Sequence, residues 1–480
     1  MSLKEKGKNA IKWSLIEKLL KRGITFVISI FLARLLEPAD FGLVAMCSFF
    51  IAFADALNDF GLGQALVQKK VVDRIQLNTV FYVNISLGLF MFGAMWVAAP
   101  YIGQFYDDDM IVNVLRVTSF NFIVKSLTIV NSSMLYKGLK YKVFAKAMFV
   151  SSVSSGTVAI IMAYLGFGVW SLVAYGLSST IINMVAIWYM TKWRPRLEFD
   201  LKSIKELWKT GLGFLNIGII NNVVDRLDNL FIGKIFSASV LGFYNRAKGL
   251  QELPQYTFIL PITRPMFPMF AKIQNDPEKI KDTFFKAIET LSFVVILLFG
   301  VMLASADNLI VIIYSDKWVE SIPYFKILLF ILPLLPVNLV VTSMLKGAGR
   351  LKLLTVITVL ERASIFFALG FGIKYGLLSY LYAFVGFKYF VFFTRIIIVQ
   401  KYMHIKLVSV LKVVIEVLSI FGLVILPLLY FVEIDNLYFD TIIKSAVFVV
   451  AYTWISALFK IKGFVYMKEE VMKSKGSVFK

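Results

Sequence analysis

Long apolar stretches, separated by short polar connections, run through the whole chain. About 20 apolar residues form a helix long enough to cross a hydrocarbon core of roughly 30 Å. Such stretches occur fourteen times, at residues 13–34, 41–58, 76–100, 111–135, 144–164, 169–191, 211–234, 240–262, 287–305, 321–345, 353–372, 378–394, 408–430 and 441–459. The pattern therefore predicts an all-α polytopic membrane protein with about fourteen transmembrane helices.

The charges of the connections indicate how these helices are oriented. With residues 1–12 placed in the cytoplasm, the cytoplasmic segments hold 33 Lys and Arg residues, whereas the outer loops hold only Lys317 and Lys374. Basic residues concentrate on the cytoplasmic side of membrane proteins. Because a missing or extra span would invert half of the loops, the contrast favours an even number of spans. Both termini are expected in the cytoplasm.

Composition narrows the class of protein and its chemistry. Hydrophobic residues make up 59% of the chain and charged residues 17%, against about 45–50% and about 25% in soluble proteins, so a soluble globular protein is excluded. The net charge of +21 is explained by the cytoplasmic loops and anionic lipid, and no nucleic-acid partner is expected. One cysteine, Cys47, and one histidine, His404, exclude metal sites built on paired His or Cys ligands. The sequence contains no P-loop for ATP.

Short matches at a nearly constant offset indicate an internal duplication. Residues 165–168 (LGFG) recur at 369–372, residues 133–135 (SML) recur at 343–345, and Phe41-Gly42 is similar to Leu241-Gly242. Each pair falls within, or directly after, spans that are six helices apart, so two six-helix lobes in a pseudo-twofold arrangement would share one orientation, as in transporters that rock around a cleft. We expect an N-terminal lobe at 1–192, a C-terminal lobe at 193–400, and two further helices with a cytoplasmic tail at 401–480.

Several spans carry charges at mid-depth. A charge that faces lipid costs about 2.5–3.5 kcal/mol on insertion scales, so these residues should face a hydrated cavity or a partner. In the first, seventh and eighth spans the polar residues recur at helical spacing and form one stripe on each helix. Ion pairing between helices is the alternative for any single residue. For the whole set, the stripes favour a water-filled cleft.

Bases outnumber acids among these mid-depth charges, which bears on the cargo. The bases are Lys21, Arg22, Lys125, Arg226, Arg246, Lys248, Arg362 and Lys388, and the acids are Asp225, Asp228, Glu252 and Glu361. A basic excess attracts an anion, and the planar guanidinium group donates two parallel hydrogen bonds to phosphate. We predict that the eight bases bind an anionic cargo, with phosphate as the leading candidate. No catalytic or metal-ligating residue is expected.

Two stretches carry a resemblance to a known family. The first comprises FLARLL at 31–36, Pro38, Phe41-Gly42 and GLGQALV at 61–67; the second comprises DNLFIGK at 228–234 and LGFYNRA at 241–247. They resemble bacterial polysaccharide flippases, the polysaccharide transporter branch of the multidrug/oligosaccharidyl-lipid/polysaccharide exporter superfamily. The chain is most similar to the type that serves lipopolysaccharide, colanic acid or teichuronic acid export. The resemblance covers the first twelve spans, and we expect it to extend to all fourteen.

The resemblance implies a function and a location. An undecaprenyl-pyrophosphate-linked oligosaccharide would move from the cytoplasmic to the outer leaflet of the bacterial inner membrane by alternating access through a cationic central cavity. Within the matched motifs, only Asp228 and Arg246 carry over. Related flippases suggest proton or sodium coupling without another cofactor, with Asp225, Asp228 and Glu361 as candidate ion sites. Membrane lipids, a polysaccharide polymerase and export machinery are the implied partners, and a monomer is expected.

Two other functions are open to the same architecture. A multidrug cation antiporter of the same superfamily would need an acidic, aromatic-lined pocket, and the basic excess argues against it. A membrane polymerase or ligase acting on the lipid-linked glycan would usually carry a substantial outer loop with catalytic Arg or acidic residues. The longest predicted outer loop, 306–320, is short and holds one lysine.

Overall fold

Every regular element in the described part of the chain is a helix, which confirms the all-α prediction. The computed structural model describes residues 3–403, 405–432 and 434–469; His404 and the side chain of Asp225 lie outside the described residues. The chain forms two compact units, Met1–Asn245 and Arg246–Lys480. The lobe boundaries at 192 and 400 stay a prediction.

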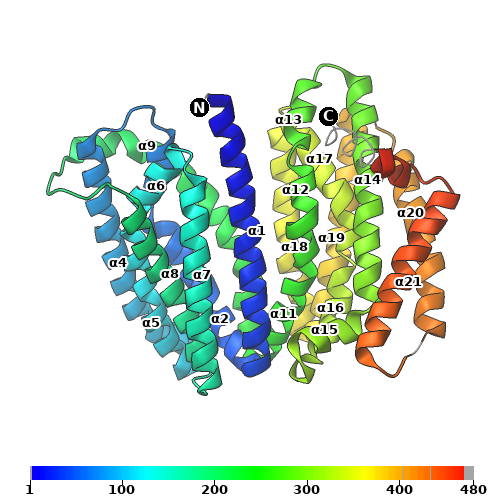
Figure 1. Ribbon diagram of the computed structural model, residues 1–480, viewed down its shortest axis with the longest axis horizontal. Helices are drawn as coiled ribbons and strands as arrows, with labels where there is room; N and C mark the ends of the chain where they lie inside the picture. The colour runs from blue at the N-terminus through cyan, green and yellow to red at the C-terminus, as the bar shows by residue number, and fades with distance from the viewer. Residues whose placement is uncertain (1–2, 404, 433, 470–480) are drawn as a thin grey trace. The chain divides into compact units, whose positions relative to one another are not determined.

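The first unit contains long helices with shorter ones between them. Figure 1 shows α1 beside α7 and α4 beside α5, and both pairs pack together. The helices of this unit are α1 (Leu3–Leu35), α2 (Pro38–Asn58), α3 (Leu62–Gln68), α4 (Arg74–Tyr106), α5 (Asp109–Ser126), α6 (Ile129–Lys137), α7 (Tyr141–Tyr164), α8 (Val169–Met190), α9 (Leu201–Asn222), η1 (Val224–Arg226) and α10 (Leu227–Ile235). Helix α11 (Ala238–Pro254) begins in the first unit and ends in the second.

The second unit is built around α14, which packs against α17, α20 and α21, while α18 and α19 pack as a neighbouring pair (Figure 1). Its elements after α11 are η2 (Gln255–Ile259), α12 (Leu260–Thr263), α13 (Met266–Lys272), α14 (Pro277–Ala304), α15 (Ala306–Tyr314), η3 (Asp316–Trp318), α16 (Ser321–Leu329), η4 (Leu332–Leu334), α17 (Leu335–Gly347), α18 (Leu351–Tyr375), α19 (Leu377–Met403), α20 (Leu407–Phe431) and α21 (Leu437–Leu458).

The fourteen predicted spans all fall on helical segments, but their exact number stays a prediction. By length and composition, ten stretches in the described part are able to cross a membrane, and α5 with α6, bent by 47° to each other, makes an eleventh. The other three predicted spans fall on α1, on α9 with α10, and on α11 with η2 and α12. These three segments carry the charged stripes.

Two irregular turns in the second unit contain or directly follow a proline. After Pro254 the backbone widens into the π-helical turn η2, and Pro333 lies in the 3₁₀ turn η4 that separates α16 from α17. Proline lacks an N–H group and its ring clashes with the preceding turn. Interruptions of this kind are tolerated at membrane depth where protein or water satisfies the backbone.

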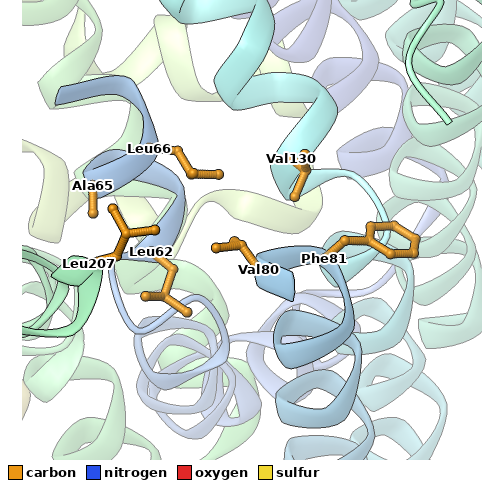
Figure 2. Packing of buried hydrophobic residues seen from close by; sticks show 7 residues of the cluster. All are labelled: Leu62, Ala65, Leu66, Val80, Phe81, Val130 and Leu207. Carbon is orange, nitrogen blue, oxygen red and sulfur yellow. The ribbon is translucent and has the colours of Figure 1, made fainter. Parts of the chain in front are cut away.

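A hydrophobic cluster joins α3 to three other helices of the first unit. Figure 2 shows its seven buried side chains: Leu62, Ala65, Leu66, Val80, Phe81, Val130 and Leu207. The three residues from α3 are spaced three and four apart, so they share one face of that helix. Phe60 and Gly61, at φ 46° and 69°, make the turn that leads from α2 into α3. On the rest of the α3 surface, Gly63 is buried and Gln64 is exposed.

Helices α2 and α11 cross closely at two matching glycines. A Cβ atom at Gly42 would overlap the backbone oxygen of Ala238, and one at Gly242 would overlap the backbone oxygen of Pro38. The two contacts are reciprocal. Gly42 corresponds to Gly242, and Pro38 to Ala238, at the offset that relates Phe41-Gly42 to Leu241-Gly242. Close backbone approach is therefore a physical reason for glycine at both positions of this repeat.

We expect Gly42→Ala to lower stability by about 1–3 kcal/mol, the usual cost of overpacking, since the opposing group is rigid backbone. Gly176 of α8 provides the matched control, because nothing lies within 4 Å of a Cβ atom placed there. Gly176→Ala should be neutral or slightly stabilising. Thermal unfolding of the detergent-purified variants measures both effects, and equal melting temperatures for the two would contradict the close crossing.

Candidate functional site

Charged side chains of the second unit gather around the α18–α19 pair. Glu361 and Arg362 come from α18, and Lys388 and Arg395 come from α19. Lys388 and Arg395 are seven residues apart, which places them on one side of their helix. Lys388 interacts electrostatically with the other three and with Lys248 of α11. The packing of α18 against α19 therefore unites residues that are far apart in the sequence.

Arg395 is the most buried cation of this cluster, at 4% exposure. Its Nη2 lies 2.5 Å from Oε1 of Glu361. Its Nη1 donates to the backbone oxygen of Asn338 at 3.1 Å and to Oγ1 of Thr342 at 2.9 Å, both on α17. One guanidinium group thus ties α17, α18 and α19 together, because its planar fork donates in several directions at once.

Lys388 also lies next to Glu361. It is half-buried, its Nζ donates to the backbone oxygen of Glu361 at 3.4 Å, and the Nζ lies 5.0 Å from the ring centroid of Phe384. The cluster holds four positive charges, on Lys248, Arg362, Lys388 and Arg395, and one negative charge, on Glu361. Its net charge is therefore +3. With Glu252, which follows Lys248 by one helical turn, the group is still net positive.

Arg246 lies on α11 close to Lys248, but its guanidinium group is held by aromatic rings. The centre of its guanidinium group is 5.6 Å from the ring of Tyr314 and 5.7 Å from the ring of Trp318. Both rings are buried. Cation–π contacts contribute about 0.5–2 kcal/mol, the larger value where water is excluded. They fix the position of the one arginine that the family resemblance carries over.

The predicted bases of the first unit are distributed over three places. Lys21 and Arg22 are exposed neighbours on α1, and Arg226 is exposed in η1. Lys125 of α5 forms an ion pair with Asp55 of α2, its Nζ 2.6 and 2.8 Å from the two carboxylate oxygens. For Lys125, therefore, the structure shows an ion pair between helices, which the sequence left open as the alternative to a hydrated cleft.

The predicted ion-coupling acids differ in what surrounds them. Asp228 is 2% exposed; its Oδ2 accepts from the hydroxyl of Tyr244 at 2.6 Å and its Oδ1 accepts from the backbone N–H of Asn229 at 3.0 Å. Glu361 contacts Arg395. The side chain of Asp225 lies outside the described residues.

Sequence reasoning missed Arg395 and Asp55. The predicted twelfth span ends at residue 394, which places Arg395 in a cytoplasmic connection, whereas α19 continues to Met403 and buries that arginine. Its seven-residue spacing from Lys388 is the signal that could have found it. Asp55 lies within the predicted span 41–58 and carries the same signal as the other intramembrane charges, but its partner is 70 residues away and no local pattern indicates that pairing.

Comparisons with known proteins agree with this architecture. A family model described as polysaccharide biosynthesis protein matches residues 31–323, well over half of the chain. The chain is 27% identical to the lipopolysaccharide biosynthesis protein WzxC of Escherichia coli (strain K12) over 353 residues, 73% of this chain and 72% of that protein. It is also 27% identical to the teichuronic acid biosynthesis protein TuaB of Bacillus subtilis (strain 168) over 284 residues, which cover 58% of each chain.

The fold is shared with a solved structure. The lipid II flippase MurJ, in an inward closed conformation, superposes with a TM-score of 0.75 at 16% sequence identity, and the match covers 94% of this chain and 98% of that chain. At this identity the match establishes the architecture, whereas function has to be argued from the site. The chain is an integral membrane protein with the helical architecture that the sequence predicts.

Proposed function

Because the chain belongs to the polysaccharide biosynthesis protein family, we propose that it is a flippase for a lipid-linked oligosaccharide. It would carry the sugar-bearing headgroup from the cytoplasmic to the outer leaflet of the bacterial inner membrane, with both termini in the cytoplasm. We further propose that the carrier is undecaprenyl pyrophosphate. WzxC and TuaB, by their names, serve the biosynthesis of lipopolysaccharide and teichuronic acid.

The observation that carries this proposal is the basic cluster of the second unit. A pyrophosphate-sugar headgroup cannot cross hydrocarbon unaided, because its charges and hydroxyl groups would lose their hydration. Arg362, Lys388 and Lys248 supply replacement partners for the phosphates, with the surplus of positive charge held near Glu361. Arg246, Lys21, Arg22 and Arg226 are further proposed contacts to the substrate.

Glu361 is the proposed coupling acid. Its carboxylate contacts Arg395, and its backbone oxygen accepts from Lys388. A proton or sodium ion at this carboxylate would weaken its hold on Arg395 and increase the positive charge offered to the cargo. Binding energy that differs between two conformations shifts their populations, which is sufficient for alternating access. Asp225 and Asp228 are the alternative coupling acids.

Deletion of the gene tests the proposed function. If the protein is a flippase, its loss should cause complete lipid-linked repeat units to accumulate on the cytoplasmic leaflet. A membrane-impermeant glycosidase or lectin cannot reach them there in intact spheroplasts. A polymerase or ligase predicts single units on the outer leaflet instead. A multidrug antiporter predicts normal glycan export together with increased sensitivity to cationic drugs. Either of the last two results would overturn the proposal.

A further inference from the structure

A cavity of about 370 Å³, with both polar and apolar groups in its lining, lies within the first unit, between the end of α2 and helices α3, α5, α6 and α8. Its volume is in the range of small-molecule sites, about 300–1,000 Å³. The lining includes the side chains of Asp59, Gln64, Lys125, Tyr136, Thr180 and Asn183. They combine carboxylate, amide, hydroxyl and aromatic groups.

Well-packed helices form the walls of this cavity. Gly63 brings α3 close to α6, since a Cβ atom there would meet Ile129 at 2.9 Å and Ser133 at 3.0 Å. The other face of α3 is anchored in the hydrophobic cluster of Figure 2, in which Leu62 and Leu66 pack with Val130 of α6. Helices α5 and α6, which are bent by 47° to each other, both contribute to the lining. The cavity is therefore bounded by closely packed helices.

The charges in the cavity do not favour a phosphate. Lys125, the one cation among the described residues that line it, is paired with Asp55 at 2.6 Å. Asp59 adds a carboxylate, whose Oδ1 accepts from the backbone N–H of Gly63 at 2.9 Å and thereby holds the group in place at the start of α3. A phosphate bound in the cavity would be repelled by the carboxylate of Asp59, and Lys125, already paired with Asp55, would not offset that repulsion.

The polar groups and the aromatic ring fit a sugar instead. Hydroxyl groups of a pyranose both donate and accept hydrogen bonds, as the carboxylate of Asp59 and the amide of Asn183 require. The ring of Tyr136 is fixed by stacking on Phe144, with 4.1 Å between the centroids, and is 40% exposed. An aromatic ring held in this way offers an apolar surface to the C–H groups of a sugar and a polar hydroxyl at its edge.

We propose that this cavity binds a sugar ring of the lipid-linked cargo, separately from the cations that bind its diphosphate. The inference rests on the proposed function and adds to it that the cavity of the first unit recognises the glycan part of the cargo. The specificity for one repeat unit over another is then set by Asp59, Gln64 and Asn183.

Two lipid probes separate these roles. Purified protein in nanodiscs is titrated with undecaprenyl diphosphate, which carries no sugar, and with the lipid-linked oligosaccharide extracted from the deletion strain; native mass spectrometry gives both affinities. Asp59→Asn and Asn183→Ala should each weaken binding of the sugar-bearing lipid about tenfold and leave binding of undecaprenyl diphosphate unchanged. Arg362→Ala should weaken binding of both probes. Asp59→Asn retains an oxygen for the Gly63 N–H, and Asn183→Ala provides an independent variant.

Ser178→Ala is the matched control on α8. The Ser178 hydroxyl bonds to Ala174 of its own helix at 2.5 Å, and the residue does not line the cavity; both affinities should equal those of the wild type. The inference is overturned if both cavity variants bind the sugar-bearing lipid as the wild type does, or if they lose both probes equally. Wild-type protein that binds neither probe would overturn the proposed function itself.

Discussion

Replacing Arg362 with alanine is expected to reduce glycan export by about tenfold to a hundredfold, and replacing Arg362 and Lys388 together is expected to abolish it. A charge-assisted hydrogen bond contributes about 1.5–3 kcal/mol, and each 1.4 kcal/mol is a factor of about ten in affinity. The double variant leaves Lys248 and Arg395 of the cluster, and Arg395 already contacts Glu361. Complementation of the deletion strain, with surface glycan quantified by immunoblot, measures the loss.

Lys352→Ala is the matched control for this prediction. Lys352 lies on α18, the helix that carries Arg362, and its side chain is exposed near the start of that helix. The control variant should export at the wild-type level, and all variants should be present in the membrane in equal amounts. Wild-type export by the Arg362→Ala, Lys388→Ala double variant would show that the cluster does not bind the cargo.

The second large effect concerns stability. Glu361→Ala is expected to destabilise the second unit by about 3–5 kcal/mol, because it leaves the buried guanidinium of Arg395 without its carboxylate. At about 2–4 °C for each kcal/mol in units of 150–250 residues, the melting temperature should fall by roughly 6–20 °C. Fluorescence-detected thermal unfolding in detergent measures the shift.

Two companion variants identify the cause of that shift. Glu361→Gln keeps an oxygen that accepts from Arg395 and should lose much less stability than Glu361→Ala. Glu361→Ala combined with Arg395→Met removes both charges and should recover most of the loss, since replacing a buried pair by apolar side chains is often neutral. A Glu361→Ala protein that melts like the wild type would show that the contact does not stabilise the unit.

The chemistry of the site could be predicted in part. Lys248, Arg362, Lys388 and Glu361 are recognisable in the sequence because a charge within an apolar span needs a special reason, and the structure brings these four together. The approach of α18 to α19 also follows from a short connection between adjacent long helices. Lys125 carries the same sequence signal, yet its partner Asp55 makes it part of an ion pair.

The sequence by itself determined the all-α membrane architecture, the approximate position of each helix and the excess of intramembrane bases. These properties depend on the local succession of apolar and polar residues, which sets how each segment partitions between water and lipid. Only the tertiary structure decided which charges meet: that Arg395 is buried against Glu361, that Lys125 faces Asp55, and that Asp59 and Tyr136 line one cavity. Contacts between helices depend on the packing of side chains distant in sequence, which local periodicity does not record.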